Sequence, residues 1–177
     1  MKSALNTGLL VLALGLATSS IANADDDRPG FPRYAGTYLI DVTLDKIGQF
    51  DCQFLLDLGF VETCDGHQVF TLHADGTMQA NDTSDFNDGF DGVAQGNWQR
   101  AGFRSLAVSG KTISLGYDVE GIFERYLIRE FSLEFSRDRT TFSGNSSTSV
   151  FSDDQDPLDP AETPDVVVTA TLTGRKL

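Results

Sequence analysis

The sequence has few of the residues on which enzymes and metal proteins usually rely for chemistry. Its 177 residues include two cysteines, two histidines and one tryptophan. Two cysteines alone cannot complete a four-ligand zinc site, so a metal would need partners such as Asp65 and His67 beside Cys64. We find no nucleophile–base pair and no phosphate-binding loop. No strong catalytic motif is therefore present, and we expect a protein that is not an enzyme, with an enzymatic role left open.

Basic residues are also scarce, since 13 Lys and Arg face 26 Asp and Glu and give a net charge of −13. This balance argues against nucleic acid, which is bound through clustered Lys and Arg, and against anionic membrane surfaces. Long apolar runs are missing as well. The apolar segment Gly8–Ala17 is shorter than the roughly 20 residues that cross a bilayer. We therefore expect an acidic protein without nucleic-acid partners and without membrane insertion.

The N-terminal segment has the features of a secretory signal peptide. Lys2 provides a positive start, Gly8–Ala17 an apolar centre, and Ala22-Asn23-Ala24 a small-residue cleavage site. We assign residues 1–24 to the signal, residues 25–35 to a flexible lead-in, and residues 36–177 to one domain. The sequence therefore predicts a periplasmic or secreted protein.

In an oxidising compartment an isolated pair of cysteines is usually bridged, so we predict a disulfide between Cys52 and Cys64. The zinc site described above remains the alternative.

Most of the remaining chain alternates apolar and polar residues with the period of a half-buried strand. Asp75-Gly76 predicts a hairpin with a type I′ turn, and Gly110-Lys111 predicts another tight turn. Short strands joined by turns predict an all-β fold, a single antiparallel up-and-down β-barrel of about eight or nine strands. The predicted strands are 36–45, 50–56, 69–74, 77–81, 93–100, 103–109, 112–119, 123–135, 140–151 and 166–173.

The segment Phe123–Phe135 is the longest predicted strand, although its composition also suits a helix. Strict alternation near its end, extended backward, places Arg125 and Arg129 on the apolar face with Leu127. A bulge near Arg129 that shifts the register is the explanation we favour. The alternative, two arginines that point inward, would make them the best site candidates in the chain.

The loop after the Asp75-Gly76 hairpin is acidic and rich in glycine. Clustered carboxylates are ligands that calcium prefers. The spacing does not match an EF-hand, so we expect a solvated loop and keep calcium as a weak alternative. The candidate ligands are Asp82, Asp85, Asp88 and Asp91.

Four short segments carry a family resemblance: Gly36-Thr37-Tyr38, residues 71–77, Gly96-Asn97-Trp98 and Phe142-Ser143-Gly144. In this order they resemble exported bacterial proteins with lipocalin-like (calycin) barrels, and they are similar to allene oxide cyclase-like barrels. The first resemblance implies a small hydrophobic ligand inside the barrel. The second implies an isomerase or cyclase that works by shaping and desolvating its substrate.

These expectations give three functional hypotheses. The first is a barrel that binds a small hydrophobic molecule, supported by 13 phenylalanines in a short chain. The second is the isomerase or cyclase. The third is a structural or interaction barrel without ligand, stabilised by calcium or paired into a homodimer through an exposed strand edge. The candidate ligand-binding residues are Trp98, Tyr117, Arg125, Arg129 and Phe131.

Overall fold

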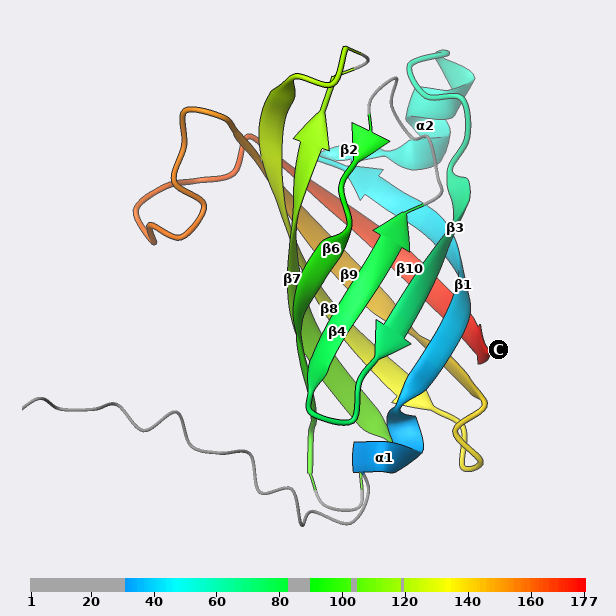
Figure 1. Ribbon diagram of the computed structural model, residues 1–177. Helices are drawn as coiled ribbons and strands as arrows, with labels where there is room; N and C mark the ends of the chain where they lie inside the picture. The colour runs from blue at the N-terminus through cyan, green and yellow to red at the C-terminus, as the bar shows by residue number, and fades with distance from the viewer. Residues whose placement is uncertain (1–30, 83–89, 103–104, 119) are drawn as a thin grey trace, which may run out of the picture.

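Eight strands close into an antiparallel barrel in the computed structural model, which describes residues 31–82, 90–102, 105–118 and 120–177 (Figure 1). The barrel strands are β1 (Gly36–Ile47), β3 (Asp65–Leu72), β4 (Thr77–Asp82), β6 (Ala94–Arg100), β7 (Ala107–Tyr117), β8 (Phe123–Phe135), β9 (Thr141–Ser152) and β10 (Val166–Lys176). The short elements are β2 (Phe50–Asp51), β5 (Phe90–Asp91), α1 (Phe31–Tyr34) and α2 (Cys52–Asp57).

Pairing between the first and last barrel strands closes the sheet. β10 pairs with β9 on one side and with β1 on the other, from Tyr38 opposite Lys176 to Ile47 opposite Val168. Every other barrel strand pairs with its neighbours in chain order. The predicted all-β, up-and-down barrel is therefore confirmed.

The two ends of the barrel carry different elements. α1 lies beneath one end, and α2 lies beside the other (Figure 1); we call these the α1 end and the α2 end. Among the residues that the structure describes, no helix is long and apolar enough to cross a membrane.

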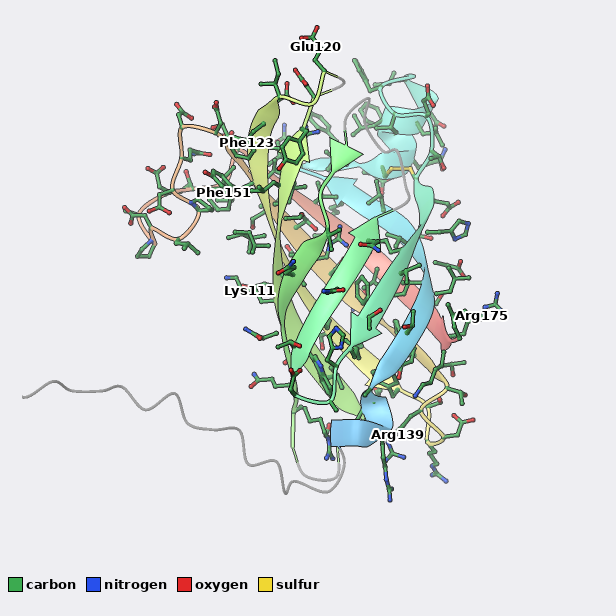
Figure 2. The ribbon with its side chains drawn as sticks, viewed as in Figure 1. Lys111, Glu120, Phe123, Arg139, Phe151 and Arg175 are labelled. Atoms are coloured by element: carbon green, nitrogen blue, oxygen red, sulfur yellow. A yellow bond between two sulfur atoms is a disulfide. The ribbon has the colours of Figure 1, made fainter. Side chains whose placement is uncertain are left out.

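The α1 end is packed around Tyr34, which is completely buried. Its hydroxyl donates to the Ser105 carbonyl at 2.9 Å, and its ring contacts Trp98 and Phe135. The guanidinium of Arg139 lies over the same ring, and Figure 2 shows this arginine beside α1. Residues 31–34 of the predicted lead-in thus form α1 and pack against this end of the barrel through Tyr34. The predicted signal peptide lies outside the described residues.

The first turn predicted from sequence forms a hairpin of a different type. Only Gly76 has a positive φ, at 86°, whereas a type I′ turn needs a second such residue. The His73 amide donates to the Thr77 carbonyl at 2.9 Å, which leaves a three-residue loop. Asp75 stabilises this loop because its carboxylate accepts from both the amide and the hydroxyl of Thr77. The hairpin is confirmed and the turn type is wrong.

The predicted strand 50–56 is also wrong, because it becomes β2 followed by α2. The Asp51 carboxylate accepts from the Gln53 amide at 2.9 Å and caps the helix N-terminus. Cys52 is nevertheless buried and bridged to Cys64, which confirms the disulfide and excludes the zinc alternative. The bridge joins α2 to the start of β3 and fits folding in an oxidising compartment.

A single strand, β7, replaces the two strands and the turn predicted around Gly110. Gly110 lies opposite Phe131 of β8, and a Cβ atom at this position would overlap the Phe131 ring. The glycine therefore makes room for a neighbouring side chain, which is a common reason for glycine within a strand.

Candidate functional site

Side-chain size divides the barrel interior into two halves. Toward the α1 end the inward residues are mostly large and fully packed: Tyr38, Phe70, Leu72, Met78, Leu133, Phe135, Phe142 and Leu172. Toward the α2 end the inward residues of β9 are Ser146, Thr148 and Val150, and those of β10 are Ala170, Val168 and Val166. These smaller side chains leave a cavity of about 280 Å³.

One side of the cavity is an apolar wall. It is built by the α2-end halves of β1 and β10, with one residue each from β8 and β9. Its lining consists of Val42, Leu44, Ile47, Leu127, Val150, Val166, Val168 and Ala170. Because these are branched or small aliphatic groups, the wall is suited to a flexible or compact apolar molecule rather than to an extended hydrogen-bonding one.

The base of the cavity carries a polar network centred on Arg129. Its Nη1 donates to Gln68 Oε1 at 2.6 Å, and its Nε donates to Thr148 Oγ1 at 3.1 Å. Gln68 has an exposed fraction of 1% and Thr148 of 7%. The guanidinium is thus fixed between β3 and β9 at the base of the cavity. This position is two residues before Phe131, whose ring packs against Phe70 with centroids 5.7 Å apart.

A second cation, Arg125, lines the cavity nearer the α2 end. It lies opposite Gly116 of β7. A Cβ atom at Gly116 would lie 2.6 Å from both Cγ and Nε of Arg125, so the stem of the arginine crosses the space that a side chain would fill. Gly116 therefore allows Arg125 to lie against the inner surface of the barrel.

Both arginines point inward because the register of β8 is continuous past Arg129. This residue pairs with Thr112 on β7 and with Thr148 on β9, and the pairings on either side follow without a shift. The one irregularity between these strands lies at Gly116 and Tyr117. The bulge that we favoured near Arg129 is therefore wrong, and the alternative of inward arginines is correct.

The other three predicted ligand-binding residues lie away from the cavity lining. Trp98 is 3% exposed, packs at the α1 end, and donates from Nε1 to the His73 carbonyl at 3.0 Å. Phe131 is 4% exposed and forms the packed layer below Arg129. Tyr117 lies on the outward face of β7 together with Ile113 and Leu115, and its ring contacts Phe123. Of the five candidates, Arg125 and Arg129 line the cavity, and ligand binding by any of the five stays a prediction.

Sequence reasoning missed the partners of Arg129 and most of the apolar wall. Gln68 occupies an inward position on β3, two residues before Phe70 of the same strand and opposite Ile40 of β1. The available signal was a polar residue at a position where alternation predicts an apolar one. The sequence also shows that the inward residues of β9 and β10 are small. That they leave a cavity follows only once the pairing of the strands is known.

The metal hypothesis finds no support among the described residues. Asp85 and Asp88 lie outside them, and only the backbone is described for Asp82 and Asp91. Within the described ranges, no three His, Cys, Asp or Glu side chains are grouped for a metal ion. His67 lies on the surface, with its Nδ1 2.9 Å from Asp41 Oδ1.

Comparison with known proteins adds no family assignment: no protein-family model matches this chain, and no curated protein matches it either.

Proposed function

We propose that this barrel binds a small molecule with an apolar body inside the cavity at its α2 end. The observation that carries the proposal is the contrast between the two halves of the interior. Phenylalanine, tyrosine and leucine fill one half, whereas small and branched residues leave about 280 Å³ in the other. Ligand pockets are typically concave, largely apolar and equipped with a few polar groups.

The cavity volume sets the size of the ligand. One water molecule needs about 10–15 Å³ of such space, so a cavity of about 280 Å³ can hold a small organic molecule. A chain of about eight carbons with a small polar head fits this space. Burial of each methylene contributes about 0.8 kcal/mol before the costs of association. Eight methylenes thus contribute about 6 kcal/mol before those costs, whereas a micromolar Kd needs about 8 kcal/mol, so we expect an affinity weaker than micromolar.

We further propose that the protein belongs to the lipocalin-like class of exported barrels and works in the periplasm or outside the cell. The closed eight-stranded barrel supports the first point. The Cys52–Cys64 disulfide supports the second, because such bridges persist in oxidising compartments.

Isothermal titration with 1-octanol tests the proposal. Val150→Trp should fill the cavity and weaken octanol binding more than tenfold. The control is Asn145→Trp, an exposed position on the same strand, which should bind as the unaltered protein does. Absence of octanol binding to the unaltered protein, or equal binding to both tryptophan variants, would contradict the proposal.

A further inference from the structure

One cation that lines the cavity, Arg125, has no ion-pair partner among the side chains that the structure describes. Arg125 lines the cavity but forms no hydrogen bond or ion pair with any residue that the structure describes. The two ion pairs found among those residues join His67 to Asp41 and Lys111 to Glu130, and neither involves a residue that lines the cavity. Arg125 therefore differs from Arg129, which is held by Gln68 and Thr148.

A purely apolar ligand fits such a site poorly. Filling the cavity removes water from the Arg125 guanidinium, and dehydrating an unpaired charge is costly. An anionic group on the ligand removes this cost, because a carboxylate accepts two parallel hydrogen bonds from a guanidinium. Arg129 offers fewer donors to such a group, since two of its five N–H donors already bind protein oxygens.

The order of residues along β8 fixes the orientation of such a ligand. Arg125 is the third residue of the strand and lies nearest the α2 end, and Leu127 is the next inward residue. Leu127 lies opposite Val150, which lies opposite Val166. A molecule whose head meets Arg125 thus places its tail against these aliphatic side chains.

We propose that the ligand is a medium-chain carboxylate amphiphile, with its carboxylate on Arg125 and its tail in the apolar wall. This inference rests on the proposed function, because it specifies the chemistry of the molecule that the cavity holds. The tail of about eight carbons is the one that the proposed function gives for this cavity.

Three ligands of equal tail length, octanoate, 1-octanol and octylamine, test the inference on the unaltered protein by isothermal titration. Octanoate should bind at least about tenfold more tightly than octanol, since a hydrogen bond to a charged group is worth about that factor or more. Octylamine should bind most weakly. Equal affinity for octanoate and octanol, or preference for octylamine, would overturn the inference while octanol binding keeps the proposed function intact. Failure of all three ligands to bind would overturn both.

Substitutions then locate the charge that is responsible. Arg125→Gln should lose at least tenfold in octanoate affinity and change octanol affinity less than threefold. Arg125→Lys should recover part of the loss. The control is Arg175→Gln, which removes an exposed arginine of β10 that Figure 2 shows at the outside of the barrel. An equal loss in the control, or none in Arg125→Gln, would refute the assignment.

Discussion

At the scale of single residues, the two inward arginines have different roles that stability measurements can separate. Arg129→Met removes the hydrogen bonds to Gln68 and Thr148 inside the barrel, so we expect a loss of about 1–3 kcal/mol in the free energy of unfolding. Arg125→Met removes no hydrogen bond within the described structure and should cost less. Urea denaturation measures both, and equal losses would contradict the distinction.

Another residue-scale prediction concerns Tyr38. Burial raises the pKa of this tyrosine from 10.0 to about 12, and the neighbouring Tyr34 is a smaller cause of the shift. Its hydroxyl donates to the Tyr34 carbonyl at 2.7 Å. Because the pKa is higher in the folded state, the resulting stabilisation is fully present below pH 10 and is lost as pH rises toward 12.

Tyr38→Phe should therefore flatten the alkaline part of the stability profile between these two pH values. Urea denaturation at several pH values measures the profile, with phenolate absorbance as a check on ionisation. An unchanged slope in the variant would show that Tyr38 does not cause the alkaline loss.

At the scale of elements, two glycines face different obstacles, and alanine substitution should distinguish them. A Cβ at Gly144 of β9 would overlap the backbone carbonyl of Ser132, which cannot move away. A Cβ at Gly116 of β7 would meet the side chain of Arg125, which can move away. We expect Gly144→Ala to cost about 1–3 kcal/mol or more. Gly116→Ala should stay folded and weaken octanoate binding.

Urea denaturation and octanoate titration of the same two variants check this pair of outcomes. Full octanoate affinity in folded Gly116→Ala would show that octanoate binding does not depend on the position of Arg125 against Gly116.

The rim element α2 depends on one covalent bridge and one helix cap. Replacement of Cys52 and Cys64 by serine opens a short loop, and we expect a loss of about 3 kcal/mol in the free energy of unfolding. The comparison is Asp51→Ala, which removes the cap and should cost about 1 kcal/mol. Urea denaturation ranks the two variants, and a larger effect of the cap would contradict this account of the element.

The sequence predicts most elements because a strand with one buried face must alternate. β1 shows this directly, since Tyr38, Ile40, Val42 and Leu44 are all buried. Alternation alone could not identify α2, because Phe50 and Phe54 are four residues apart and share a face in a helix as well as in a strand. In the structure their exposed rings stack at 6.2 Å between centroids.

At the scale of the whole molecule, the location of the cavity follows from a size gradient along neighbouring strands. β9 changes from Phe142 to Ser146 to Val150 along its inward face, and β10 pairs with it in register. The gradient can be read from the sequence, but only the barrel closure shows that small residues face small residues. The inward direction of Arg125 and Arg129 similarly depends on a register that a single bulge would have reversed.

The most direct test of the account is an NMR measurement of contacts between octanoate and methyl groups of the protein. The apolar wall and the packed half offer matched reporters, Val150 and Val168 on one side and Leu133 and Leu172 on the other. We predict nuclear Overhauser contacts from the octanoate tail to the two valines and none to the two leucines. Contacts confined to outward residues such as Ile113 and Leu115, or no contacts to the protein at all, would contradict a binding cavity inside this barrel.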